Sequence, residues 1–365
     1  WNGCNAPVPF CSNVLVPKCD CAAMRIKNYS QQELPDSFHS LNALLLFDIS
    51  SGQLETLPHE FGNNHRRLVH LAIVDNRLES VPDSTGSLVY LGFLWLPYNR
   101  LSSIPDTIGN LKRLYFLSIS NNQLETLPTA VGERKNLIFL LANNNNISTL
   151  PESVGTLPIL QFLSLQDNRI ERLPEAIGGL ISLQVLSVAH NSLISLPSTL
   201  RRMQKLKYLQ ISHNRLKSLP EDIGDCSSLL RVQGSNNRMQ GIPTSITNAA
   251  YLNVIDLRFN EVLTLPPFLN SLKKLQYFYA HGNPICNKSS IPDFLHNVNG
   301  GCAQQCSLDC PSFFRLENTH KECNDGDYTY EMSHVLERGD DIMPVPNKGC
   351  NTASCKFHDS NCNKR

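Results

Sequence analysis

The amino-acid sequence has no excess charge of either sign and no long apolar run. Thirty-two Lys and Arg residues balance 32 Asp and Glu residues over 365 residues, which gives a formal net charge of zero. A balanced chain has no bulk attraction to nucleic acid or to an anionic membrane, so neither is an expected partner. No stretch approaches the roughly 18 apolar residues of a membrane-spanning helix, and we expect no membrane insertion by this segment.

The sequence also lacks the local motifs that mark common catalytic sites. It contains no G-x-S-x-G, no P-loop and no H-E-x-x-H. An enzyme needs a nucleophile, a base and an oxyanion or metal site that converge, and no residues of recognisable spacing supply them. We therefore expect a protein that is not an enzyme and that carries no cofactor.

Cysteine is nearly absent from the body of the chain and concentrated at its two ends. Of 13 cysteines, only Cys226 lies between positions 21 and 286. Even-numbered sets at both ends of a cysteine-poor body predict disulfide-stapled caps and an oxidising, extracellular compartment. The predicted disulfide residues are Cys4, Cys11, Cys19 and Cys21 at one end and Cys286, Cys302, Cys306, Cys310, Cys323, Cys350, Cys355 and Cys362 at the other.

Zinc is the competing interpretation of the C-terminal set. The spacing of Cys302, Cys306 and Cys310 could be ligand spacing, but no paired histidines complete a familiar zinc pattern. We expect Cys226 to be a small buried residue and not a reactive thiol. Three N-x-S/T sequons agree with secretion and predict N-linked glycans. They begin at Asn28, Asn146 and Asn287.

A repeat of 23 residues occupies the cysteine-poor body. The pattern LxxLxLxxNxLxxLP recurs from Leu68 to Ile285, after one 24-residue step from Leu44. This makes eleven repeats, with Gly52 in place of the asparagine in the first. The asparagines are Asn76, Asn99, Asn122, Asn145, Asn168, Asn191, Asn214, Asn237, Asn260 and Asn283. Met24 and Ile26 with Leu34-Pro35 predict one further, degenerate turn near the N-terminal end.

Each repeated residue type predicts one structural element. The L-x-L triplets, such as Leu94/Leu96, alternate with period two, so both leucines face inward from a short strand, and stacked strands form a parallel sheet. The asparagine side chain is expected to hydrogen-bond backbone groups of adjoining turns. The Leu-Pro pair begins the return path, and an Ile-Gly pair such as Ile108-Gly109 predicts a short helical turn on the convex side.

The repeat resembles the leucine-rich-repeat family over about two thirds of the chain, from Leu44 to Cys286. The LPxxIGxLxxL variant is similar to the 23-residue class of Ras-pathway scaffolds and their plant and protist relatives. The resemblance implies an α/β solenoid, a horseshoe with a concave parallel β-sheet and covered ends. We expect a cysteine-rich N-terminal cap at 1–43, eleven repeats at 44–286 and a disulfide-rich C-terminal cap and module at 287–365.

The last cysteines resemble the end of a Lin-Notch repeat, C-N-x-x-x-C-x-F-D-G-x-D-C. The chain has Cys350-Asn351, then Cys355-Lys356-Phe357-His358-Asp359 and Asn361-Cys362. That family holds calcium with carboxylates, but His358 and Asn361 replace both aspartates and Asp359 replaces the glycine. The resemblance therefore implies a degenerate module in which calcium is doubtful, with Asn351 and Asp359 as the weak candidate ligands. Combined with leucine-rich repeats, such a tail resembles secreted or surface proteins of water moulds and related protists.

An outward column of apolar residues precedes the inward leucines. Four successive phenylalanines occupy it, and aromatic residues often anchor interfaces. We predict a protein-binding concave face, although packing along the strand edge explains the column equally well. The predicted partner-binding residues are Phe93, Trp95, Tyr98, Phe116, Phe139, Leu141, Phe162, Tyr208, Tyr277 and Tyr279.

Two smaller patterns have weaker interpretations. His190 and His213 occupy equivalent positions in adjacent repeats, with His281 near the same edge, and could bind metal or sense pH, but ordinary polar choices at a variable position explain them better. Arg338-Gly339-Asp340 spells a short integrin-type tripeptide that arises easily by chance.

Two functions therefore stay open. The leading one is extracellular recognition of a protein partner by a receptor ectodomain or secreted protein. The alternative is a structural building block of a cell-surface or extracellular assembly, in which another copy of the chain or a matrix component is the partner.

Overall fold

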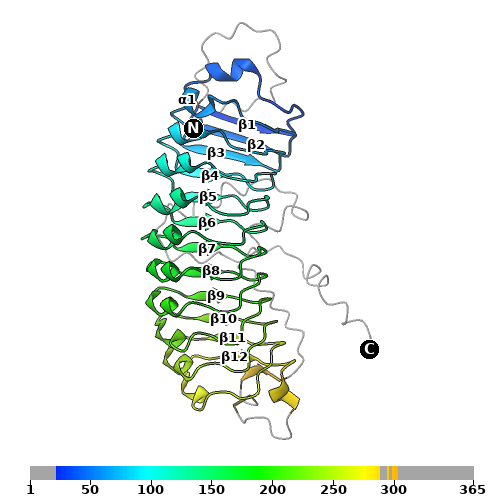
Figure 1. Cartoon of the computed structure of the whole chain (residues 1–365), viewed down its shortest axis with the longest axis vertical. Helices are drawn as coiled ribbons and strands as arrows, with labels where there is room; N and C mark the ends of the chain where they lie inside the picture. The colour runs from blue at the N-terminus through cyan, green and yellow to red at the C-terminus, as the bar shows by residue number, and fades with distance from the viewer. Residues whose placement is uncertain (1–21, 288–293, 296–297, 303–365) are drawn as a thin grey trace, which may run out of the picture. The chain divides into compact units, whose positions relative to one another are not determined.

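The computed structural model describes residues 22–287, 294–295 and 298–302, and the fold of this part of the chain is a single parallel sheet of 13 strands. Sheet order follows chain order, so each repeat adds one strand beside the last (Figure 1). The strands are β1 (Ala23–Lys27), β2 (Leu46–Ser50), β3 (His70–Val74), β4 (Phe93–Trp95), β5 (Phe116–Ser118), β6 (Phe139–Leu141), β7 (Phe162–Ser164), β8 (Val185–Ser187), β9 (Tyr208–Gln210), β10 (Arg231–Gln233), β11 (Val254–Asp256), β12 (Tyr277–Tyr279) and β13 (Asn299–Gly301).

Short helical turns lie on the opposite side of each coil from its strand (Figure 1). Most begin directly after a proline that follows Leu, Ile or Val; Pro105, with φ −67° and ψ 147°, holds the chain extended before its turn. The α-helical turn is α1 (Phe61–Asn64), and the 3-10 turns are η1 (Asp36–Ser40), η2 (Asp83–Ser87), η3 (Asp106–Asn110), η4 (Thr129–Glu133), η5 (Glu152–Thr156), η6 (Glu175–Gly179), η7 (Ser198–Arg202), η8 (Ile223–Asp225), η9 (Thr244–Asn248), η10 (Leu269–Ser271) and η11 (Pro284–Asn287).

The glycine of the Ile-Gly pair allows these turns to stack closely. A Cβ atom on Gly155 would clash with the carbonyl oxygen of Ala176 in the next turn, and one on Gly224 would clash with the carbonyl oxygen of Ser245. Neither glycine has a positive φ. The residue is therefore required by the close approach of two backbones and not by an unusual conformation.

The core runs between the sheet and the turns along the whole array. Leu91, Leu94, Leu96 and Leu101 from one repeat expose 1% or less of their surface, and equivalent residues continue through every repeat. A single turn could not bury these side chains alone, because each one packs against its counterparts in the repeats before and after. The predicted inward orientation of the L-x-L triplets is confirmed.

The asparagines form a ladder that joins successive coils. Asn122 accepts a hydrogen bond from the backbone N–H of Leu101 at 3.0 Å and donates to the carbonyls of Leu96, Ile119 and Ser120, each at 3.0 Å. The bonds to Leu96 and Leu101 reach into the preceding repeat. The predicted role of the ladder in pairing buried backbone groups is confirmed.

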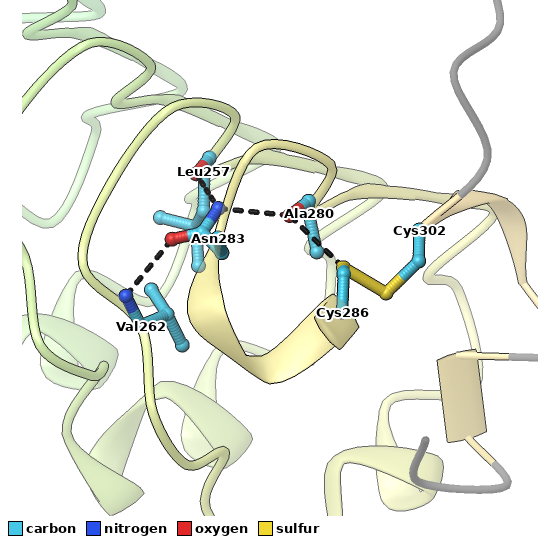
Figure 2. Close-up of a disulfide and its surroundings, with 6 residues drawn as sticks. All are labelled: Leu257, Val262, Ala280, Asn283, Cys286 and Cys302. Atoms are coloured by element: carbon cyan, nitrogen blue, oxygen red, sulfur yellow. Dashed lines mark hydrogen bonds between the residues drawn. A yellow bond between two sulfur atoms is a disulfide. The ribbon is translucent and has the colours of Figure 1, made fainter. Parts of the chain in front are cut away.

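The last rung lies beside a disulfide. Figure 2 shows Asn283 accepting from the N–H of Val262 and donating to the carbonyls of Leu257 and Ala280. Three residues later, Cys286 is joined to Cys302. This bond ties the end of the last repeat to the segment that follows β13, which pairs with β12 in parallel.

The sheet extends by one strand beyond the predicted repeats at each end. β1 contains Met24 and Ile26 and pairs with β2 over five residues, which confirms the degenerate turn expected there. β13 was not expected, because its Asn-Gly-Gly sequence has no apolar alternation. The division at residues 43 and 286 stays a prediction.

Candidate binding surface

The outward face of the sheet holds the residues predicted to bind a partner. We number each repeat from its first leucine, so that residues 91–113 are one repeat. In each strand the third and fifth residues lie on either side of the inward fourth residue and point away from the core. Because adjacent strands pair in register, equivalent residues form continuous columns: Phe93 pairs with Phe116, and Trp95 pairs with Ser118.

The third-position column is a stack of aromatic rings. Ring centroids are 4.4 Å apart for His70 and Phe93, 4.2 Å for Phe93 and Phe116, 5.8 Å for Phe116 and Phe139, and 4.7 Å for Phe139 and Phe162. Each such contact contributes about 0.5–1.5 kcal/mol beyond the area it buries. The rings therefore stabilise the array whether or not a partner binds.

This stacking supports packing along the strand edge as the explanation for the middle of the phenylalanine column. Phe116 exposes only 2% of its surface and Phe139 only 7%, because each ring lies between two others. Phe93 and Phe162, at the ends of the run of four phenylalanines, are half-buried. A partner can therefore contact the ends of the column, at Phe93 and Phe162, whereas Phe116 and Phe139 in its middle mainly pack the repeats together.

Trp95 is the most prominent apolar side chain of the fifth-position column. Its cross-strand partners are the small residues Ala72 and Ser118, so no large side chain pairs with it from the flanking strands. The indole lies edge-on to Phe93 with centroids 6.0 Å apart and is half-buried. Leu141, one strand beyond Ser118, is half-buried as well.

Tyr98 belongs to a different set of positions from the other aromatic residues. It has φ +56°, and the equivalent residue of every other described repeat is also left-handed. Asn, Asp, His and Gly tolerate this conformation best, and they fill eight of the eleven positions. The sequence contains this signal directly before each ladder asparagine, but the prediction overlooked it. The residues are Ser51, Asp75, Tyr98, Asn121, Asn144, Asp167, His190, His213, Asn236, Phe259 and Gly282.

A hydrogen-bonded polar ladder replaces the aromatic surface in the later repeats. Ser187 Oγ donates to Gln210 Oε1 at 2.9 Å, and Gln210 Nε2 donates to Gln233 Oε1 at 2.7 Å. Earlier in the array, Asn143, which lies two residues past the end of β6, accepts a hydrogen bond through Oδ1 from Ser164 Oγ on β7 at 2.6 Å. The change of the fifth residue from Trp or Leu to Ser or Gln signals this ladder, which sequence reasoning missed.

The three predicted tyrosines near the C-terminal end of the sheet are half-buried. Tyr208 lies on β9, and Tyr277 and Tyr279 lie on β12 with ring centroids 6.1 Å apart. The guanidinium of Arg258 lies 5.4 Å from the ring centroid of Tyr279 and pairs with both carboxylate oxygens of Asp256, at 2.8 and 2.6 Å. The structure does not bring these tyrosines together with Trp95, which lies five strands or more away.

The histidines of the left-handed column form a stacked pair. The rings of His190 and His213 are 4.0 Å apart and nearly parallel, and His190 Nδ1 lies 3.8 Å from Asp167 Oδ1. Burial raises the pKa of Asp167, and the adjacent His190 opposes this shift. Burial with the nearby Arg25 charge lowers the pKa of His70 to about 4, so this ring is neutral at pH 7.

No group of three or more His, Cys, Asp or Glu side chains that could hold a metal ion occurs within the described residues. Cys226 is fully buried, with Sγ 3.2 Å from the Leu200 carbonyl oxygen, and burial raises the pKa of its thiol to about 12. The prediction of a small buried cysteine is confirmed. In the same part of the chain, no helix has the length and apolarity needed to cross a bilayer.

The structure confirms one disulfide, between Cys286 and Cys302. The sequon asparagines Asn28 and Asn287 are exposed and Asn146 is half-buried, while their glycosylation stays a prediction. The other ten predicted disulfide cysteines, the weak calcium candidates Asn351 and Asp359, and the Arg338-Gly339-Asp340 tripeptide lie outside the described residues.

Comparison with known proteins supports the repeat assignment. Residues 80–167 and 148–239 match the family model described as "Leucine-rich repeat region". No curated protein sequence matches the chain significantly.

Solved structures match most of the described array. A leucine-rich-repeat protein of Leptospira interrogans is 27% identical, with 69% of this chain and 70% of that chain covered and a TM-score of 0.57. The plant peptide hormone receptor RGFR1, in complex with RGF2, is 27% identical, with 72% and 47% covered and a TM-score of 0.55. The Arabidopsis receptor kinase HAESA, in complex with the peptide hormone IDA and the co-receptor SERK1, is 25% identical, with 71% and 48% covered and a TM-score of 0.54. The match spans less than half of either plant receptor chain.

Proposed function

We propose that this leucine-rich-repeat solenoid is a recognition protein that binds a protein partner, outside the cell, on the outward face of its sheet. The observation that carries the proposal is the half-buried cluster of Phe93 and Trp95, with Leu141 half-buried two strands further along the Trp95 column. Because only Ala72 and Ser118 flank Trp95 on the adjacent strands, its indole packs edge-on against Phe93 and stays partly exposed. Tryptophan is the residue type most enriched among interface hot spots.

The columns around the cluster divide the face by chemistry. In the third-position column phenylalanine rings occupy β4 to β7, and in the fifth-position column hydrogen-bonded amides and hydroxyls occupy β8 to β10. A partner that fits this division places an apolar side chain over Trp95 and Leu141 and a polar group over Gln233, because Gln233 is half-buried whereas Ser187 and Gln210 are buried. The polar ladder then contributes mainly specificity, because its amides must exchange hydrogen bonds with the partner.

Two further observations support this assignment. The plant receptors RGFR1 and HAESA, of similar repeat architecture, were solved with bound peptide hormones. The Cys286–Cys302 disulfide and the exposed sequons at Asn28 and Asn287 suit an oxidising, secretory environment. Structural resemblance alone supports function only by analogy, so the test must address the residues themselves.

The experiment is capture of partners by the full chain from a displayed library of secreted and cell-surface proteins of its source organism. Trp95→Ala is expected to weaken the binding of a captured partner by at least about 30-fold. This corresponds to the loss of about 2 kcal/mol or more that defines a hot spot. Ile194→Ala is the matched control, because Ile194 is 41% exposed and lies past the C-terminal end of its strand, off the sheet face. Equal binding by wild type and Trp95→Ala, with folding retained, contradicts the proposal.

Mass photometry of the same preparation separates recognition from a structural role. Discrete monomers that capture a ligand agree with recognition. Ordered polymers of the chain by itself favour a building block of an extracellular assembly.

A further inference from the structure

The edge of the sheet where the strands begin carries positive charge and no negative charge within the described repeats. Three residues of each coil lie there: the last two residues of one repeat and the second residue of the next, directly before the strand. We call these positions the basic edge. Its nine cationic residues are Arg66, Arg67, Lys112, Arg113, Lys135, Lys205, Lys207, Lys273 and Lys274; eight are exposed and Lys207 is half-buried.

The negative charge lies elsewhere. Acidic residues collect in the helical turns on the other side of each coil, for example Asp83, Asp106, Glu152 and Glu175, which each begin a turn. The acidic residues nearest to the basic edge in sequence, Glu133 and Asp225, also belong to turns. Within the described repeats, the cations of the basic edge and the acidic residues that begin the helical turns therefore lie on different parts of each coil, which composition does not reveal.

Repetition makes this charge a line. Arg67 and Lys274 occupy the same position nine repeats apart, about 43 Å at about 4.8 Å per strand. Arg113 precedes β5 and Lys135 precedes β6, and these two strands are adjacent in the sheet. Elsewhere along the edge, successive cations are separated by two or three repeats, about 10–14 Å. Cations on one coil or on consecutive coils thus lie within a Debye length of about 8 Å and their fields overlap, whereas the gaps of two or three repeats exceed that length and divide the edge into groups of positive charge.

Two exposed tyrosines lie among these cations. The Arg113 guanidinium lies 4.7 Å from the ring centroid of Tyr90, and Lys274 Nζ lies 4.2 Å from that of Tyr251. In both pairs the cation occupies the same repeat position as the tyrosine, one coil later. The rings expose 46% and 52% of their surface, so each holds a cation in place and still offers area to a ligand.

From this arrangement we propose that the basic edge binds a linear sulfated polysaccharide. Sulfate groups pair with the Lys and Arg side chains, and the apolar C–H face of a sugar ring packs on Tyr90 or Tyr251. The spacing of the cations favours this class over nucleic acid, in which one strand carries a phosphate about every 3.4 Å. Gaps of two or three coils would leave several phosphates without a partner, whereas a polysaccharide can place sugar rings on the tyrosines and its sulfate groups on the groups of cations. This surface is separate from the Trp95 cluster, so the two proposals can fail independently.

The test measures binding of fluorescent heparin to the full chain by anisotropy at several salt concentrations. The edge variant combines Lys112→Ala, Arg113→Ala and Lys135→Ala, three cations on two consecutive coils. It is expected to bind heparin at least tenfold more weakly at physiological salt. Loss of three ionic contacts should also reduce the slope of log affinity against log salt by about 2 to 3.

The matched control removes the same charge from the other edge. Arg100→Ala, Arg169→Ala and Arg215→Ala each remove an exposed arginine that lies past the C-terminal end of its strand. This triple variant should change heparin affinity by less than twofold. A second edge variant, Lys273→Ala with Lys274→Ala, provides an independent measurement at the far end should the first variant fold poorly.

Three results would overturn the proposal. One is unchanged heparin binding by both folded edge variants. Another is an equal loss in the control, which would show a response to total charge only. The third is equal competition by single-stranded DNA or by desulfated heparin, which would indicate a nucleic-acid surface or a general polyanion surface.

Discussion

Replacement of one rung of the asparagine ladder tests how the coils are joined. In Asn122→Ala, the N–H of Leu101 loses its hydrogen-bond partner, because Asn122 Oδ1 is its acceptor. The three carbonyls that receive the Asn122 amide each keep another donor: Asn99 for Leu96, Asn145 for Ile119 and the Tyr98 N–H for Ser120. The variant therefore leaves one buried N–H without a hydrogen bond and removes one of the hydrogen bonds to each of three carbonyls, which an ordinary surface substitution does not do.

The expected cost follows from these groups. A buried unsatisfied N–H costs about 1–3 kcal/mol, and the weakened carbonyl contacts add about 1 kcal/mol, so the free energy of unfolding should fall by roughly 2–4 kcal/mol. Denaturant unfolding followed by circular dichroism measures this loss. The matched control is Gln123→Ala, which removes an exposed amide from the next residue and should change stability by less than about 0.5 kcal/mol.

Asn122→Asp separates donating from accepting. The carboxylate can still accept from Leu101 but faces three carbonyl oxygens, so its pKa in the folded state should be raised above the unfolded value of about 3.9. Folding then favours the protonated form, and the variant should lose stability relative to wild type as pH rises above about 4. Equal stability of wild type and Asn122→Ala, or an Asp variant that is more stable at pH 7 than at pH 4, would refute this role of the ladder.

Three further predictions concern other parts of the array. Gly155→Ala should destabilise the fold by several kcal/mol because its Cβ meets a backbone carbonyl, whereas Gly241→Ala, whose Cβ has its nearest contact at 3.4 Å, should be nearly neutral; thermal unfolding compares them. Because the pKa of His70 is lowered to about 4, the stability that its neutral ring contributes is complete above pH 6.5 and is lost as pH falls towards 4. In His70→Gln, the free energy of unfolding should therefore fall by up to roughly 3 kcal/mol less between pH 7 and pH 4 than it does in wild type, as measured by denaturant unfolding at both pH values. Removing the Cys286–Cys302 bond with Cys286→Ser and Cys302→Ser should cost about 3 kcal/mol and speed hydrogen exchange in β12 and β13 first; unchanged exchange there would contradict its role as an end clamp.

The array could be predicted from the sequence because its causes are local and repeated. An inward leucine, a ladder asparagine and a Leu-Pro pair each act within one coil, and their recurrence fixes the register of the sheet. β13 could not be predicted, because an Asn-Gly-Gly strand is specified by its pairing with β12 and not by its own side chains.

The candidate surface was predicted less completely. Alternation correctly placed Phe116 and Phe139 on the outward face, but it could not show that neighbouring rings would bury them, because that depends on how the rings of three coils pack together. Tyr98 was predicted as a partner-binding residue just beyond its strand, but alternation could not show that it occupies the left-handed position of the bend. The separation of charge between basic edge and turns was hidden by the balanced composition.

The most direct test of partner recognition is hydrogen exchange of the full chain with and without a captured protein partner. Recognition by the outward face predicts slower exchange of the backbone around Trp95 and Leu141, in β4 to β6. The helical turns η3 to η5 of the same repeats should exchange at unchanged rates. Slower exchange confined to those turns, with β4 to β6 unaffected, would place the partner elsewhere and contradict the proposed function.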